Sequence, residues 1–228
     1  MPHLVSRLLP IVALFVACRS LAPTTPTADL YRRVAASSVI VVTRTGSGSG
    51  TVIATDADTT LVLTAEHVVA GSERHVRIAL NAEVTSLAGK PVVVPALVVF
   101  ADKGVDLALL ATAEPLCLPA LPIAAVEPEI YETVIIVGAP MGLEGTAVPG
   151  LLTAKDKRLH GMDLWEITGL TFFGSSGGTL ANTRGELIGV PIVVAVWNSL
   201  PIPQIGFAVP LSSIHDFLDH AVEKLGTR

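Results

Sequence analysis

Hydrophobic residues fall in short runs along most of the chain, and Gly, Asp, Asn or Pro separates each run from the next. Short runs rich in valine, isoleucine and leucine are typical of β-strands rather than of helices. The pattern therefore predicts about a dozen strands in two sets. The first set is 39–43, 51–54, 60–63, 76–80, 92–100 and 107–111, and the second is 132–137, 151–153, 164–168, 178–180, 187–196 and 206–209.

Three prolines separate the two sets of strands, because Pro115, Pro119 and Pro122 interrupt the pattern. Two sets of short strands joined by turns predict two antiparallel barrels. We expect an all-β fold of two six-stranded barrels, the first over about residues 36–114 and the second over about residues 123–210.

The hydrophobic spacing changes from that of a strand to that of a helix after residue 210. Apolar residues there share one face, which predicts a helix over 211–225 that packs on the second barrel. That face consists of Leu211, Ile214, Leu218, Ala221, Val222 and Leu225. A shorter helix is predicted at 29–36, with Thr27 as its N-cap.

An apolar run near the start of the chain follows Arg7 and is too short to span a bilayer, as in a signal peptide. Its end, Phe15-Val16-Ala17-Cys18, resembles a bacterial lipobox, in which the cysteine is lipidated. Ordinary cleavage after Ala22 is the alternative. We expect residues 1–18 to be a signal peptide, 19–28 a tether and 29–228 the domain of an exported protein of the bacterial periplasm or cell envelope.

Composition narrows the classes of function. Hydrophobic residues make up 50% of the chain and charged residues 15%, and the formal net charge is -5. With no basic stripe between aromatic residues, this balance argues against nucleic acid as a partner. Cys117 is the one cysteine besides Cys18, so the mature domain can form no internal disulfide, and we expect Cys117 to be buried and inert. No metal-ligand spacing occurs, and neither a metal nor an organic cofactor is expected.

The segment Gly174-Ser175-Ser176-Gly177-Gly178 places glycines on both sides of a serine. A serine hydroxyl attacks a carbonyl only beside a base and converging N–H donors, and glycines let the backbone bend so that such donors converge. Ser176 is therefore the candidate nucleophile. Gly174, Ser175 and Ser176 form the candidate oxyanion hole, with the N–H groups of Gly174 and Ser176 as donors. A surface turn before a strand is the alternative interpretation.

A histidine and an aspartate lie beside two predicted strands of the first set. His67 follows a β-branched run, and Asp106 begins another. With Ser176 they give the order His, Asp, Ser, which is that of chymotrypsin-type peptidases and not that of subtilisins or α/β-hydrolases. The remaining histidines lack this context, and Asp102 lies in a predicted turn. Glu66 is expected to be a solvated neighbour of His67, because adjacent residues of a strand face opposite sides.

Six motifs occur in a fixed order: Gly48-Ser49-Gly50-Thr51-Val52-Ile53, Thr64-Ala65-Glu66-His67-Val68-Val69, Asp106-Leu107-Ala108-Leu109-Leu110, Gly138-Ala139-Pro140-Met141-Gly142, Gly174-Ser175-Ser176-Gly177-Gly178 and Gly206-Phe207-Ala208-Val209-Pro210. In this order they resemble trypsin-like serine peptidases, and over residues 30–224 the bacterial HtrA (DegP-like) group in particular. The resemblance implies a chymotrypsin-like fold, a catalytic triad of His67, Asp106 and Ser176, and polypeptide substrates. It suggests trimers but leaves the oligomeric state open, and no PDZ module is expected here.

The same resemblance implies where a substrate binds. Leu170, six residues before the nucleophile, would form the base of the primary pocket, and Ile192 with Gly206, Phe207 and Ala208 would form its walls. An apolar pocket predicts a preference for small or medium aliphatic side chains. The segment 206–209 is also expected to offer an edge on which a substrate strand could pair.

These observations predict an exported serine endopeptidase that acts in quality control or processing of envelope proteins. Two alternatives remain open. A catalytically silent module would bind peptides in the cleft between the barrels without cleaving them. An esterase would use the same three residues on another substrate.

Overall fold

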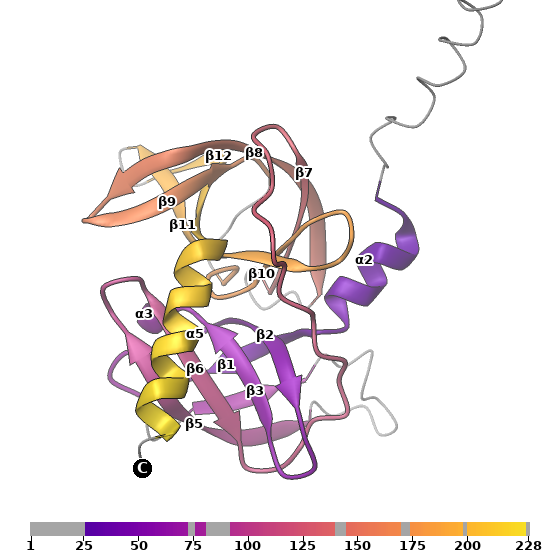
Figure 1. The fold of residues 1–228 in the computed structure, drawn as a ribbon, viewed down its shortest axis with the longest axis vertical. Coiled ribbons are helices and arrows are strands. Elements are labelled where there is room, and N and C mark those ends of the chain that lie inside the picture. Colours follow the sequence, from indigo (N-terminus) through magenta and orange to yellow (C-terminus); the bar gives the residue numbers. More distant parts are fainter. Residues whose placement is uncertain are drawn as a thin grey trace, which may run out of the picture.

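Two closed antiparallel barrels of six strands each lie one above the other, with a helix at the C-terminal end of the chain (Figure 1). The computed structural model describes residues 26–72, 76–80, 92–139, 145–169, 174–197 and 200–226. The predicted all-β fold of two six-stranded barrels is therefore confirmed. Of the candidate site residues, Cys18 and Leu170 lie outside the described residues, and so do the predicted signal peptide, the alternative cleavage site at Ala22 and residues 140–142 of one motif.

The first barrel joins its strands in the order β1-β2-β3-β6-β5-β4, and β4 closes it by pairing with β1. Side chains alternate along each strand, so that Val41, Val62, Ile78 and Leu110 are fully buried in its core. The strands are β1 (Ser38–Val42), β2 (Ser47–Thr55), β3 (Thr60–Thr64), β4 (Val76–Ala79), β5 (Val93–Asp102) and β6 (Leu107–Thr112).

The second barrel has the order β10-β11-β12-β9-β8-β7, and β7 closes it by pairing with β10. Its core contains Ile136, Leu152, Ile167 and Ile188, each almost completely buried. The strands are β7 (Thr133–Gly138), β8 (Thr146–Leu159), β9 (Met162–Ile167), β10 (Thr179–Ala181), β11 (Leu187–Trp197) and β12 (Leu200–Pro210).

Two short helices lie at the start of the domain and after β3. Helix α2 (Ala28–Ala35) begins at Thr27, whose side chain accepts a hydrogen bond from the N–H of Leu30 at 3.3 Å, so the predicted N-cap is confirmed. Helix α3 (Glu66–Val69) is a single turn that follows β3 directly. Glu66 and His67 therefore lie on a helical turn, and the argument that strand alternation separates them was wrong.

The C-terminal helix α5 (Leu211–Gly226) continues from β12 and lies alongside the first barrel (Figure 1). Its buried residues are Leu211, Ile214, Phe217 and Ala221. The ring of Phe217 meets the ring of Phe100 from β5, with the ring centroids 5.1 Å apart. The helix thus contacts the first barrel as well as the second.

Part of the predicted helix face was wrong. Val222 is 73% exposed and Leu225 is 39% exposed, whereas Phe217, which the prediction omitted, is buried. The physical reason is that the ring of Phe217 packs against Phe100 of β5, and Val222 lies about 100° around the helix from the buried Ala221.

A shared hydrophobic cluster joins the two barrels. It includes Leu63 and Leu107 from the first barrel, Ile135 and Val190 from the second, and Phe217 from α5. Because these side chains pack together, the strands that carry the candidate site are held in one arrangement.

Several features outside the cores bear on the predictions. Cys117 is exposed, so the expectation of a buried thiol was wrong. Its neighbours Leu116 and Leu118 pack in the core of the first barrel, and Cys117 between them faces outward. Of the helices in the described part of the chain, none has both the length and the apolar character that a membrane span requires. Among the same residues, no three His, Cys, Asp or Glu side chains are grouped so that they could hold a metal ion.

Candidate active site

His67 lies on α3, the helical turn that follows the end of β3. Its side chain is 45% exposed, so part of the imidazole is accessible from outside. Its Nδ1 atom lies 2.7 Å from Oδ2 of Asp106. The structure thus brings together two of the residues that the sequence selected, although they are far apart in the chain.

Asp106 fixes both the ring and the backbone of the histidine. Its Oδ1 atom accepts a hydrogen bond from the N–H of His67 at 2.9 Å, and its backbone carbonyl accepts one from the N–H of Glu66 at 3.2 Å. Asp106 has a positive φ of 55°, a conformation that aspartate tolerates better than most residues. This turn directs the carboxylate at α3 and leaves Asp106 only 8% exposed.

The environment raises the pKa of His67 above its ordinary value of 6.5. The largest cause is the hydrogen bond to Asp106, which favours the protonated ring. Partial burial opposes this effect, and the negative charges of Asp106 and Glu66 add to it. The imidazole is therefore a stronger base than an isolated histidine.

Ser176 lies in a tight turn that precedes β10, and this turn packs against the first barrel. The N–H of Ser49 on β2 donates to the carbonyl oxygen of Ser176 at 2.8 Å, and the N–H of Gly177 donates to the carbonyl oxygen of Pro191 at 2.8 Å. Gly177 has a φ of 81°, and a Cβ atom there would collide with Thr64 and Ser49. Glycine is required at this position by both conformation and space.

The same contacts place the Ser176 turn beside the segment that carries His67. A Cβ atom on Gly48 would lie 2.7 Å from the side chain of Val68 and 3.0 Å from the carbonyl oxygen of Ser176. Gly48 therefore allows α3 and the serine turn to approach the same point of β2. The second barrel supplies the serine, and the first supplies the histidine and aspartate.

The hydroxyl of Ser176 is half-buried and donates a hydrogen bond to the carbonyl oxygen of Ile192 at 3.1 Å. Among the hydrogen bonds of the described residues, none joins this hydroxyl to His67. The predicted contact between nucleophile and base therefore stays a prediction. Rotation about χ1 of the serine is the motion that would redirect its Oγ, since a serine side chain has three staggered positions.

The candidate oxyanion hole is the backbone of Gly174, Ser175 and Ser176. Gly174 has a φ of 97°, which is accessible to glycine. Within the part of the chain that the structure describes, no carbonyl or side chain accepts a hydrogen bond from the N–H of Gly174, Ser175 or Ser176. The assignment of the N–H groups of Gly174 and Ser176 as oxyanion-hole donors stays a prediction.

The residues that the family resemblance assigns to the specificity pocket differ in their exposure and in the strands that carry them. Ile192 is 3% exposed on β11, and its carbonyl oxygen holds the Ser176 hydroxyl. Ala208 is fully buried in the core of the second barrel, Gly206 is buried and Phe207 is half-buried. The remaining pocket residue, Leu170, is not described.

The expected substrate-pairing edge at 206–209 was wrong. At Gly206, Phe207 and Ala208, β12 pairs with β11 on one side and with β9 on the other. Both sides of the main chain are already hydrogen-bonded because the barrel is closed. The adjacent strand β11 pairs with β10 only up to Gly189, so its main chain beyond Pro191 has a partner strand on one side among the described residues.

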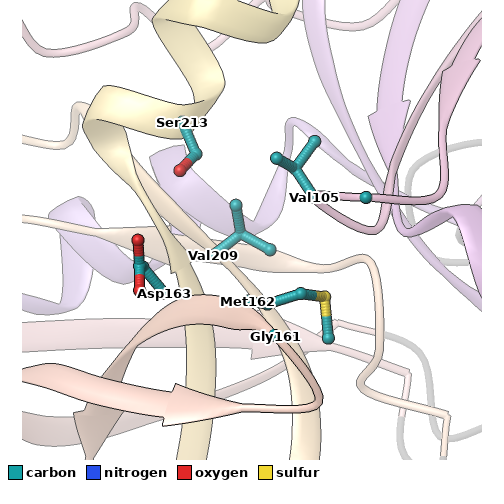
Figure 2. A pocket seen from close by; sticks show the side chains of 7 residues that line it. Val105, Gly161, Met162, Asp163, Val209 and Ser213 are labelled. Atoms are coloured by element: carbon teal, nitrogen blue, oxygen red, sulfur yellow. The ribbon is translucent and has the colours of Figure 1, made fainter.

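A small cavity of about 120 Å³ lies near the turn that precedes Asp106. Val105 from that turn, Met162 and Asp163 from β9, Val209 from β12 and Ser213 from α5 contribute to its walls (Figure 2). None of His67, Asp106 and Ser176 lines it, so this cavity is distinct from the candidate site.

Ser49 is a residue of this region whose role the sequence did not reveal. Its hydroxyl donates to the carbonyl oxygen of Gly174 at 2.7 Å and accepts from the N–H of Ala139 at 2.9 Å. In the sequence, the feature that could have indicated this role was a serine between two glycines, directly before the strand predicted at 51–54. Its partners become apparent only when the two barrels are together.

Two six-stranded barrels with a histidine–aspartate pair and a glycine-bounded serine at their junction define a chymotrypsin-like fold of the serine peptidase class. Residues 48–190 match the family model described as a trypsin-like peptidase domain. This match covers more than half of the sequence, and the chain belongs to the trypsin-like peptidase family.

Curated relatives are serine proteases of the HtrA type, which confirms the resemblance seen in the motifs. Serine protease HTRA1B of Danio rerio is 28% identical over 207 residues, covering 87% of this chain and 39% of that protein. Mitochondrial serine protease HTRA2 of Bos taurus is 32% identical over 189 residues, covering 78% of this chain and 37% of that protein. The chain spans about two-fifths of the length of these relatives.

Solved structures with a similar fold match most of this chain as well. The serine endoprotease from Yersinia pestis has a TM-score of 0.70 and 27% identity, covering 87% of this chain and 68% of that chain. An inactive serine-to-alanine mutant of Rv3671c from M. tuberculosis H37Rv has a TM-score of 0.65 and 26% identity, covering 88% of this chain and 96% of that chain.

Proposed function

We propose that this chain is a serine endopeptidase in which Ser176, His67 and Asp106 form the catalytic triad. The observation that carries the proposal is the 2.7 Å contact between His67 Nδ1 and Asp106 Oδ2. A carboxylate in this position holds Nδ1 protonated and leaves Nε2 free to accept a proton. Membership of the trypsin-like peptidase family supports the same assignment.

In the proposed reaction, Oγ of Ser176 attacks the carbonyl carbon of a peptide bond while His67 Nε2 takes the hydroxyl proton. The carbonyl oxygen becomes negative and accepts hydrogen bonds from the N–H groups of Gly174 and Ser176. His67 then gives its proton to the leaving amine as the carbon–nitrogen bond breaks. A water molecule repeats the sequence on the acyl enzyme and releases the second product.

An extended polypeptide is the proposed substrate. The main chain of β11 beyond Pro191 begins beside Ser176 and has β12 as its described partner, so we expect a substrate strand to pair on its other side. Polypeptide substrates are also implied by the HtrA serine proteases to which the chain is similar. An aliphatic residue before the scissile bond is proposed from Leu170 and Ile192, both apolar.

We also propose that the protein is exported and acts on polypeptides in the bacterial cell envelope, in quality control or processing. The apolar run after Arg7 supports export, and Cys18 supports a lipid anchor. Trimers are proposed from the family resemblance alone.

Casein hydrolysis by the wild type and by Ser176→Ala tests the proposed function. The wild type should hydrolyse casein and be labelled on Ser176 by a fluorophosphonate, whereas Ser176→Ala should do neither, because no other group supplies the nucleophile. Ser212→Ala changes an exposed serine on α5 and is the matched control. Labelling of Ser176→Ala would contradict the assignment, and cleavage mainly after Lys, Arg or Glu would contradict the aliphatic pocket.

A catalytically silent peptide-binding module is the second candidate, and one observation favours it. The Ser176 hydroxyl donates to the carbonyl oxygen of Ile192 instead of to His67. A wild-type protein that binds unfolded casein without cleaving it, and that resists fluorophosphonate, would support this candidate and exclude the peptidase.

A further inference from the structure

Ser49 connects the strand β2 to three different segments around the candidate active site. It is completely buried, and its backbone and side chain take part in four hydrogen bonds outside the strand ladder. Its N–H donates to Ser176, its hydroxyl donates to Gly174 and accepts from Ala139, and its carbonyl oxygen accepts from the hydroxyl of Thr64.

These bonds fix the orientation of consecutive peptide groups in the serine turn. The Ser49 hydroxyl holds the carbonyl oxygen of Gly174 at 2.7 Å, and the Ser49 N–H holds that of Ser176 at 2.8 Å. Between them, the N–H of Gly178 holds the carbonyl oxygen of Ser175 at 3.0 Å. In a trans peptide the N–H points opposite to the carbonyl, so fixing the Ser175 carbonyl also fixes the N–H of Ser176.

The hydrogen bonds of the Ser49 hydroxyl also fix the direction in which its proton points. It accepts from the N–H of Ala139 at the end of β7, so its own proton is left to bond Gly174. Ala139 is 5% exposed, and its N–H is paired in this way. The contact therefore links β2, β7 and the serine turn through one side chain.

We propose that Ser49 is a positioning residue for the oxyanion hole. Ser49 holds the Gly174–Ser175 and Ser176–Gly177 peptide groups against β2. These two groups flank the Ser175–Ser176 peptide, which carries the N–H of Ser176, and the first of them adjoins the peptide that carries the N–H of Gly174. With its neighbours held, each of these N–H groups stays directed at the carbonyl oxygen of a bound substrate. This role rests on the proposed function, and Ser49 acts through these neighbours without touching the substrate.

A second polar contact between the barrels serves as a control. It distinguishes the orientation of the peptide groups in the serine turn from the general packing of one barrel against the other. The hydroxyls of Thr51 on β2 and Thr179 on β10 lie 2.7 Å apart, and both residues are fully buried. This pair lies two residues further along the same strand and forms no hydrogen bond with the carbonyl groups of residues 174–176 in the described structure. Loss of the Thr51 hydroxyl should weaken the contact between barrels without turning the peptide groups of the serine turn.

Ser49→Ala and Thr51→Val, prepared in the full chain, test the proposal. Removal of an oxyanion-hole donor lowers kcat by about 10²-fold to 10³-fold, and a residue that acts through such donors should cost about tenfold or more. We expect Ser49→Ala to lower kcat for a peptide substrate with little change in KM, and to weaken binding of a peptide boronate by a similar factor. Thr51→Val should lower the melting temperature and keep the wild-type kcat.

Hydrogen–deuterium exchange gives a readout that does not depend on activity. Exchange in the segment 174–178 should become faster in Ser49→Ala and stay unchanged in Thr51→Val. A wild-type kcat in Ser49→Ala, equal loss of kcat in both variants, or unchanged exchange in 174–178 would each overturn the positioning role. If the wild type neither hydrolyses peptides nor reacts with a fluorophosphonate, the proposed function fails, and the exchange measurement alone decides whether Ser49 orders the turn.

Discussion

At the scale of single residues, Asp106 determines how His67 is presented. One carboxylate oxygen bonds the imidazole and the other bonds the backbone N–H of the same histidine, so ring and main chain are held together. The positive φ of Asp106 makes this double contact sterically accessible. An amide in place of the carboxylate would keep the size of the side chain but lose its charge.

Asp106→Asn should therefore lower kcat by about 10⁴-fold, as the same change does in a related triad. In the wild type, kcat/KM should rise with pH as His67 loses its proton, with an inflection above 6.5 because the pKa is raised. In Asp106→Asn the inflection should move to lower pH, since the largest cause of the raised pKa is removed. Asp102→Asn is the matched control, at the end of β5 where the structure places Asp102 instead of in the predicted turn. A wild-type pH profile in Asp106→Asn would contradict this account.

The same pKa shift has a consequence for stability. A group whose pKa is higher in the folded state than in the unfolded state stabilises the fold while it is protonated. The His67–Asp106 pair therefore contributes below the unfolded pKa, and the contribution is lost as pH rises through the folded pKa of His67. Function and stability at this site thus have opposite pH dependence.

At the scale of secondary structure, α5 ties the end of the second barrel to the first. Phe217 is 2% exposed and contacts Phe100, while Val222, on the next turn and a half, is 73% exposed. A hydrophobic periodicity alone could not distinguish these residues, because both are apolar. The neighbouring strand β5 decides which side chain is covered.

Phe217→Ala should lower the free energy of unfolding by about 3–5 kcal/mol, because it removes a buried ring and leaves a cavity between helix and barrel. Val222→Ala on the same helix should change it by less than about 0.5 kcal/mol. Urea unfolding followed by circular dichroism measures both values. Similar small effects of the two substitutions would show that α5 adds little to the contact between the barrels.

At the scale of the whole molecule, the candidate site exists because two barrels meet. His67 and Asp106 come from one barrel, Ser176 from the other, and a hydrophobic cluster with Phe217 joins them. The turn of Ser176 is hydrogen-bonded to β2, so neither barrel holds the proposed triad alone.

Attachment of the whole protein to a membrane is predicted to depend on Cys18. Produced in a bacterium from the full sequence, the wild type should fractionate with membranes, and Cys18→Ala should abolish this association because the thiol proposed to carry the lipid is absent. Cys117→Ala removes the exposed thiol of the domain and is the matched control. Equal membrane association of wild type and Cys18→Ala would exclude the lipid anchor.

Much of the fold was readable from local patterns. Strands such as β3 and β6 appeared where expected, because β-branched and apolar runs between turn residues favour a strand with a buried face. The strand β8 was predicted only at 151–153 but runs over Thr146–Leu159. Its charged residues around Lys157 hid it, since they gain their strand conformation from pairing with β9.

The sequence by itself determined the number of barrels, the order of the chemically active residues and the family, because these follow from local hydrophobic patterns and motif spacing. Only the tertiary structure decided that Asp106 bonds His67, that β12 has no free edge at 206–208, that Ser49 holds the serine turn and that the Ser176 hydroxyl bonds Ile192. Each of these joins residues distant in the chain, and such contacts depend on how the closed barrels pack together rather than on any local run of residues.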